Sequence, residues 1–316
     1  MDTLESTLNH NAGTAGARCS RRRFAVIYDK PIAELIERRF SCRTYADQPI
    51  AAQTQQRLRE RMTSLGAGPF GTPLRFELVA ATEQDRAALK GLGTYGFIRG
   101  AAGFIVGAVG RGAKDFEDYG YAMEALILAA TELDLGTCWL GGTFTRSSFA
   151  EKIHASSEEH MPAVASIGRV ANPEQARRGL LRRLTQAESR LSWEILFFDQ
   201  EFGTPLVRES AGRFAPVLDL VRLAPSGSNK QPWRIVKDGE TWHFYIERTP
   251  GYGKGLATRL LGSKSEAFPD IQRIDLGIAI CHFDLASREI GVMGTWVVED
   301  PTLGGPLTEY VASFVV

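Results

Sequence analysis

The sequence has no excess of charge of either sign. Its 316 residues include 37 Lys and Arg against 37 Asp and Glu, so the formal net charge is zero at neutral pH. Nucleic-acid binding depends largely on an excess positive field, which this chain lacks. We therefore expect no nucleic-acid partner, and we interpret the basic run around Arg177, Arg178, Arg182 and Arg183 as a solvated helix face.

Cysteine is scarce, and its spacing excludes two classes of protein. The four cysteines, Cys19, Cys42, Cys138 and Cys281, lie far apart without a CxxC pair. This spacing fits neither a zinc site nor a dense disulfide framework, so we expect a reducing, cytoplasmic environment.

Long apolar runs are also missing. The most apolar helical stretch, residues 122–135, contains Glu124, Glu132 and Asp134 and is shorter than the roughly 18 residues that a membrane span requires. Residues 1–24 carry early acids and no apolar segment, unlike a secretory signal, and are expected to form a disordered tail. The sequence thus predicts no contact with a membrane.

From Tyr28 onward, helical and strand patterns alternate, which predicts an α+β or α/β layered domain. Asp29 and Pro31 suit the start of a first helix. Residues 51–62 predict a second helix, whereas residues 73–81, 101–110 and 162–170 predict strands. Residues 121–136 are apolar on nearly every side at helical length, so this segment is expected to be a buried central helix.

The same order of segments returns after residue 200. Residues 73–76, Pro-Leu-Arg-Phe, resemble residues 232–235, Pro-Trp-Arg-Ile, at an offset of 159. A helical segment ending at Gly136 aligns with one ending at Gly291, at an offset of 155. We infer two diverged tandem halves, residues 25–198 and a shortened 199–316, which fold as an intramolecular pseudo-dimer.

Residues 37–50 contain an Arg-x-Ser-x-Arg group, Arg39, Ser41 and Arg43, where a predicted helix ends. Two guanidiniums and a hydroxyl suit a phosphate and the polar edge of a heterocycle. Arginine at the end of a helix is also favoured by the helix dipole, so the motif alone leaves a solvated helix end as the alternative.

Residues 223–236 form a second candidate, a loop of small and turn-forming residues before a strand. Pro225, Ser226, Gly227 and Asn229 leave the backbone open to a flat ligand, and an asparagine amide both donates and accepts. The alternative is an ordinary turn. The Gly-x-Gly-x-x-Gly pattern at residues 91–96 does not predict a dinucleotide site, because it follows a predicted helix and precedes a predicted strand.

These segments carry a resemblance to the nitroreductase family. RFSCRTY resembles its helix-end motif, APSGSNKQPW is similar to its Pro-Ser-x-x-Asn-x-Gln-Pro-Trp loop, and DLGTCWLGG resembles the stretch after its central helix. The fused form, with RLSWEILFF in the middle and RIDLGIAICHF late, is similar to a branch of single-chain pseudo-dimers. The resemblance implies a nitroreductase-like α+β fold with FMN at the interface between the halves.

Carried over by position, the resemblance implies one FMN per chain, because the first half keeps the Arg motif and the second half keeps the loop. The implied cofactor-binding residues are Arg39, Ser41, Arg43, Trp139, Leu140, Gly141, Gly142, Arg190, Pro225, Ser226, Gly227 and Asn229. No catalytic side chain is assigned, since the flavin carries the redox chemistry. Adjacent Cys281 and His282 point in different directions on a helix, so we expect core residues rather than a nucleophile pair.

The function implied is an oxidoreductase that takes electrons from NADH or NADPH and passes them to a small electron-poor acceptor such as a nitroaromatic or a quinone, with ping-pong kinetics. Two alternatives stay open at this point. One is a flavin-binding storage or sensor protein with little turnover, and the other is a flavin-free structural protein. Because the interface is internal, we expect a monomer.

Overall fold

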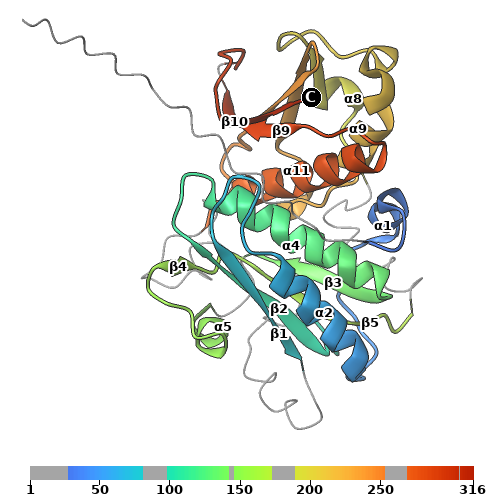
Figure 1. The fold of residues 1–316 in the computed structure, drawn as a ribbon, viewed down its shortest axis with the longest axis vertical. Coiled ribbons are helices and arrows are strands. Elements are labelled where there is room, and N and C mark those ends of the chain that lie inside the picture. Colours follow the sequence, from blue (N-terminus) through green and yellow to red (C-terminus); the bar gives the residue numbers. More distant parts are fainter. Residues whose placement is uncertain (1–27, 81–97, 142–145, 173–188, 253–268, 306) are drawn as a thin grey trace, which may run out of the picture.

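The computed structural model describes residues 28–80, 98–141, 146–172, 189–252, 269–305 and 307–316. Its elements form two sheets with two long helices between them (Figure 1). The elements before residue 190 are α1 (Ile32–Arg38), α2 (Ala52–Ser64), β1 (Leu74–Ala80), β2 (Gly103–Gly110), α4 (Asp115–Glu132), β3 (Leu135–Leu140), α5 (Arg146–Lys152), β4 (Glu159–His160) and β5 (Val164–Arg169). Those after it are α8 (Trp193–Leu196), β6 (Phe197–Asp199), η1 (Arg208–Phe214), α9 (Ala215–Arg222), η2 (Gly227–Asn229), β7 (Trp233–Asp238), β8 (Thr241–Glu247), α11 (Ile271–Glu289), β9 (Thr295–Val297) and β10 (Thr308–Val315).

The two sheets share one topology. The first has the order β1-β2-β5-β3, with β4 also paired to β2, and the second has the order β6-β7-β8-β10-β9. Each step from β1 to β3, and each step from β7 to β9, is antiparallel. The register agrees too, since Trp139 pairs with Ala165 in the first sheet as Trp296 pairs with Phe314 in the second. Four strands of each sheet therefore correspond one to one: β1, β2, β5 and β3 of the first sheet match β7, β8, β10 and β9 of the second.

The central helices, α4 and α11, lie side by side and run in the same direction (Figure 1). Their N-terminal ends are joined by Arg273, whose Nη2 lies 2.6 Å from the Glu117 carboxylate. Nearly all of the 18 residues of α4 are buried, as the apolar pattern predicts, because the helix has a sheet on one side and α11 on another. The core of the molecule is thus continuous across the two sheets.

Glycines allow these helices to approach closely. A Cβ added at Gly120 would lie 2.2 Å from the carbonyl oxygen of Ile274, and one added at Gly277 would lie 2.1 Å from that of Glu117. Both glycines, and both of their contacts, are 157 positions apart. The contact of a glycine with a backbone carbonyl of the other helix therefore occurs twice, once from α4 to α11 and once from α11 to α4.

This spacing corrects the predicted offset of 155 for the central helices. The sequence alignment matched Gly136 with Gly291, but the structure places Gly291 in correspondence with Asp134. Both end their helices in the left-handed region, Asp134 at φ 58° and Gly291 at φ 76°. An Asp can take this conformation in place of the more usual Gly, which hides the match in the sequence.

The start of α1 also differs from the prediction. The helix begins after Pro31, and Asp29 does not cap it; the Asp29 carboxylate faces Arg57 instead. The first backbone N–H groups, those of Ile32 and Ala33, donate to Glu289 at the end of α11, at 2.5 and 3.2 Å. A cap from so distant a residue has no local sequence signal.

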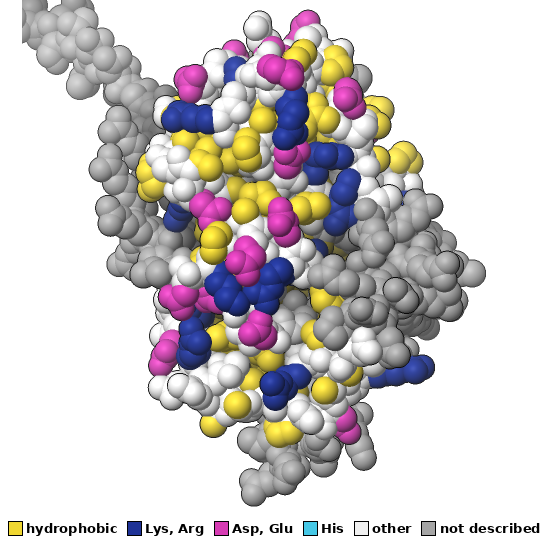
Figure 2. Space-filling model, turned by 90° about the vertical axis from the view of Figure 1, so that its right-hand side faces the viewer, with side chains coloured by type: hydrophobic (Ala, Val, Ile, Leu, Met, Phe, Trp, Pro, Cys, Tyr) yellow, Lys and Arg dark blue, Asp and Glu magenta, His cyan; other side chains and the backbone are white. Residues whose placement is uncertain are grey.

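The predicted boundary between halves, 198/199, falls inside β6, which pairs in parallel with β7 of the second sheet. The predicted tail, the glycine pattern at 91–96 and the basic residues Arg177–Arg183 lie outside the described residues. Within the described part, no helix is long and apolar enough to span a membrane. Basic and acidic side chains are interspersed over the face drawn in Figure 2, as the balanced composition predicts.

Candidate functional site

The Arg-x-Ser-x-Arg segment lies beside β3. After α1 the chain turns extended at Arg39, Ser41 forms a parallel bridge with Thr137, and the Cys42 N–H donates to the Thr137 carbonyl at 2.8 Å. Two segments that the sequence predicted to bind the same ligand are thereby neighbours.

Arg39 and Trp139 share a buried carboxylate. Arg39 Nε lies 3.4 Å from Glu124 Oε1, and Trp139 Nε1 donates to Glu124 Oε2 at 2.8 Å. The Arg39 side chain is 6% exposed and Glu124 is fully buried. Both side chains are thus anchored to Glu124, and their predicted contacts with a ligand stay predictions.

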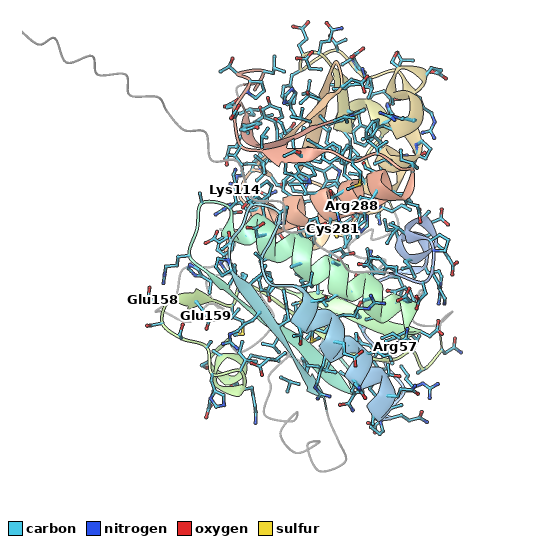
Figure 3. The ribbon with its side chains drawn as sticks, viewed as in Figure 1. Arg57, Lys114, Glu158, Glu159, Cys281 and Arg288 are labelled. Atoms are coloured by element: carbon cyan, nitrogen blue, oxygen red, sulfur yellow. The ribbon has the colours of Figure 1, made fainter. Side chains whose placement is uncertain are left out.

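Glu124 also joins the two central helices. Its Oε1 lies 3.2 Å from His282 Nε2, while His282 Nδ1 lies 3.0 Å from the Leu220 carbonyl in α9. Both His282 and Cys281 are fully buried on α11, which Figure 3 shows between the sheets with Cys281 and Arg288 labelled. The prediction that Cys281 and His282 are core residues is confirmed.

Leu140 is also a core residue. Its side chain is 4% exposed and packs in a second hydrophobic cluster with Phe104 and Phe149. Any contact of Leu140 with a ligand would therefore be made by its backbone. Gly142 lies outside the described residues.

Arg43 has a spare donor. Its Nη1 is buried and has no hydrogen-bond partner within the described chain. Burying a charged donor without an acceptor is costly, so its presence points to a ligand that supplies the acceptor.

The second predicted segment is a strained turn. Ser228, Asn229 and Gln231 all have positive φ, at 51°, 56° and 49°. Side-chain oxygens accept from two backbone groups of the turn: the Gln231 N–H donates to Ser226 Oγ, and the Gly227 N–H donates to Asp275 Oδ1, both at 2.9 Å. Left-handed non-glycine residues persist where surrounding structure fixes them, often at binding sites.

Arg190 is attached to this turn. Its Nη1 lies 3.4 Å from Asn229 Oδ1, and its Nη2 donates to the Leu223 carbonyl at 3.3 Å. Asn229 Nδ2 donates in turn to the Ser189 carbonyl at 3.0 Å. Arg190 and Asn229, which come from different sequence motifs, are therefore in direct contact.

The strand end of the first sheet and the turn of the second meet over one side chain, Ile271. A Cβ at Gly141 would lie 2.7 Å from Ile271 Cδ1, and a Cβ at Gly227 would lie 2.8 Å from Ile271 Cγ2. Ile271 thus packs directly against the backbone of both glycines, and any larger residue at either position would have to displace it.

Three polar residues of this region were missed by the sequence analysis. Gln231, 2% exposed, accepts from the Leu191 N–H at 2.9 Å. Tyr252 packs its hydroxyl against Gly227, and burial raises its pKa to about 12. Asp275 is 2% exposed, and burial raises the pKa of its carboxyl well above the ordinary value. Of the three, only Gln231 could have been found from the sequence, because it belongs to the segment APSGSNKQPW that resembles the family's loop.

The residues present are compatible with FMN, because buried polar atoms beside both predicted segments have hydrogen-bonding capacity to spare. Arg43 Nη1 and Asp275 Oδ2 are buried polar atoms that no described residue satisfies. Ile271 lies against both Gly141 and Gly227, so the two predicted segments are in contact through one side chain. The Nε of Arg39 already faces Glu124.

Comparison with known proteins places this arrangement in a family. The family described as "Putative TM nitroreductase" matches residues 31–287. A search of curated proteins finds no match.

Two solved structures illustrate the structural likeness. One is described as a putative nitroreductase from Thermotoga maritima, with a TM-score of 0.55 and 16% identity, covering 94% of this chain and 98% of that one. Another, described as a putative nitroreductase in complex with FMN from Desulfovibrio desulfuricans, has a TM-score of 0.38 and 22% identity, covering 46% of this chain and 89% of that one. The first of these supports the fold over nearly the whole chain.

Proposed function

The chain belongs to this nitroreductase family, and from that premise we propose that it is an FMN-dependent oxidoreductase whose two halves form one composite site. The observation that carries the proposal is the meeting of Gly141 and Gly227 on Ile271. It joins the segment after β3 to the turn before β7, the two places to which the family resemblance assigns the cofactor.

The proposed pseudo-dimer is supported by the matching sheets and by the glycine contact made twice across α4 and α11. In a symmetric dimer an interface site occurs twice. Here the first half, 25–198, supplies the Arg motif, and the second half, 199–316, supplies the intact turn. One FMN per chain, in a monomer, follows from this division.

Each residue has a proposed part in holding the cofactor. Arg43 supplies a free charged donor, Ser41 a hydroxyl, and Asn229 an amide edge fixed by Ser189 and Arg190. The backbone of Leu140 and Gly141, with Gly142, would line one side, and Pro225, Ser226 and Gly227 the other. Arg39 and Trp139 would support the site from behind through Glu124.

The bound cofactor would supply the redox chemistry, taking a hydride from NADH or NADPH and passing electrons to a small electron-poor acceptor such as a nitroaromatic or a quinone. The protein's own contribution would be binding and orientation. Because Glu124 is shared between Arg39, Trp139 and His282, it would also keep the two halves of the site in a fixed relation.

The first test is the absorbance spectrum of freshly purified protein, with released cofactor identified by chromatography. We expect one FMN per chain. A protein that binds no flavin after incubation with excess FMN would contradict the proposal and favour the structural alternative.

The second test separates an enzyme from a storage or sensor protein. Under argon, NADH or NADPH should bleach the flavin band, and initial-rate plots with a nitroaromatic or quinone should show the parallel lines of a ping-pong mechanism. A flavin band that neither nucleotide bleaches would contradict turnover, and intersecting lines would contradict the mechanism.

A further inference from the structure

Asp118 and Asp275 occupy corresponding positions in the two central helices, 157 residues apart. Each carboxylate binds the backbone of the loop that precedes one of the corresponding strands β1 and β7. Asp118 binds residues 70 and 72, before β1, and Asp275 binds residue 227, before β7. The two aspartates thus allow a comparison between the turn before β7, which keeps the loop motif, and the turn before β1, which lacks it.

The two carboxylates differ in how many of their oxygens accept a hydrogen bond from the loop backbone. Asp118 accepts from Phe70 N–H with Oδ1 and from Thr72 N–H with Oδ2, both at 2.8 Å. Asp275 accepts from Gly227 N–H with Oδ1 at 2.9 Å, and its Oδ2 is buried without a partner in the described chain. A spare oxygen therefore exists only on the side where the predicted ligand loop is intact.

Among the residues that the structure describes, no cation forms an ion pair with Asp275. The charged and titratable groups acting on it are Asp270 on its own helix and Tyr252, whose hydroxyl packs against Gly227 and bonds with Ser228. From α4, Asp115 and Glu117 are both engaged by Arg273. Burial raises the pKa of the Asp275 carboxyl, which favours its protonated form, and because Oδ1 accepts from the Gly227 N–H, Oδ2 is the oxygen able to carry the proton.

The position of Asp275 relates this donor to the composite site. Ile271, which contacts both Gly141 and Gly227, lies one helical turn before Asp275 and so on the same face of α11. The spare Oδ2 is therefore next to the point where the two halves meet.

We propose that Asp275 binds the cofactor directly: its Oδ1 fixes the Gly227 turn, and its Oδ2–H donates a hydrogen bond to an acceptor atom of the flavin. The inference rests on the proposed function, since it requires that the site takes FMN. The proposed role of Asp275 is to recognise a ring nitrogen or a carbonyl oxygen, which a neutral acid can bind and a carboxylate would repel.

The first test is FMN binding to the apoprotein, followed by fluorescence quenching, in wild type, Asp275→Leu, Asp275→Asn and the matched control Asp118→Leu. Asp275→Leu should weaken FMN binding tenfold or more, and Asp275→Asn, which keeps both an acceptor and a donor, should restore most of it. Asp118→Leu should lower stability and leave the dissociation constant within twofold. Equal weakening by the two leucine variants would overturn the proposal.

The second test remains valid if Asp275→Leu does not fold. An infrared difference spectrum of wild type against Asp275→Asn should contain the carbonyl stretch of a protonated carboxylic acid, and this band should move when FMN is added. A missing or unmoved band would overturn the proposal. If wild type binds FMN while these results fail, the further inference alone is wrong; if wild type binds no FMN, the proposed function is wrong and this inference with it.

Discussion

Glu132 and Glu289, 157 residues apart at the ends of α4 and α11, together hold the start of α1. Glu132 Oε1 accepts from the N–H groups of Asp29 and Lys30 at 2.6 and 3.1 Å. Glu289 accepts from those of Ile32 and Ala33. Because α1 leads directly into Arg39, Ser41 and Arg43, the helix pair fixes the direction from which the Arg motif reaches β3.

Removing this distant cap should loosen α1 and the motif after it. We expect Glu289→Ala to lower the free energy of unfolding by about 1–2 kcal/mol, the usual cost of losing a helix cap, and to weaken FMN binding. Urea unfolding and FMN titration measure the two effects. Glu34→Ala on the exposed side of α1 is the control and should change stability by less than about 0.5 kcal/mol. Equal effects of the two variants would contradict the capping role.

The close approach of α4 and α11 predicts a steric effect. In Gly277→Ala the new methyl would meet the Glu117 carbonyl, which belongs to helix backbone and cannot swing away. We expect a loss of at least about 2 kcal/mol of stability, as for an overpacked core. Gly66→Ala is the control, because nothing lies within 4 Å of that added methyl. A Gly277→Ala protein as stable as Gly66→Ala would show that the helices can separate freely.

The proposed cofactor contacts predict a difference between neighbouring residues. Arg43→Ala and Asn229→Ala should each weaken FMN binding by about 1–3 kcal/mol, because a charged or buried hydrogen bond is lost. Lys230→Ala, next to Asn229 but exposed, is the control and should bind FMN as wild type does. Unchanged titrations for both site variants would overturn the assignment of these residues.

The sequence was informative where the signal is local. Apolar runs predicted the strands that became β1, β2 and β5 and the buried helix α4. Turn-forming residues predicted the segment that contains the left-handed Ser228 and Asn229. These features depend on the chemistry of a few consecutive residues.

Other parts of the site depend on contacts that the sequence does not reveal. Asp275 lies in a buried helix and binds Gly227, 48 residues away, while the cap on α1 comes from Glu289, more than 250 residues away. Glu124 likewise appears in the sequence only as an acid in a buried helix, and the structure joins it to Arg39 and Trp139. Such roles are set by helix packing, which brings distant side chains together.

The Glu124 network predicts a strong effect on stability. Glu124→Ala would leave the Arg39 guanidinium, the Trp139 indole and the His282 ring without their shared acceptor in the interior. Breaking a buried charge pair from one side typically costs about 3–5 kcal/mol. Denaturant unfolding measures the loss.

A comparable loss is expected for Asp284→Ala, whose carboxylate accepts from Tyr121 and Trp296, but only Glu124→Ala should also weaken FMN binding. Equal effects of the two variants on FMN would contradict a link between Glu124 and the site.

The last prediction concerns acid stability at the edge of the first sheet. Hydrogen bonds from Arg75 Nε and Nη2, at 2.8 and 3.0 Å, lower the pKa of Glu159 from 4.5 to about 2. The folded state therefore binds fewer protons than the unfolded one, so the stabilisation is present above about pH 4.5 and is lost as the pH falls toward 2. Urea unfolding at both ends of this range should show Glu159→Gln to be less stable than wild type at the higher pH, and this difference in stability should shrink at the lower pH.

The exposed neighbour Glu158, labelled with Glu159 in Figure 3, supplies the control Glu158→Gln. A difference for Glu159→Gln that stays constant with pH would contradict the role of the Arg75 contact.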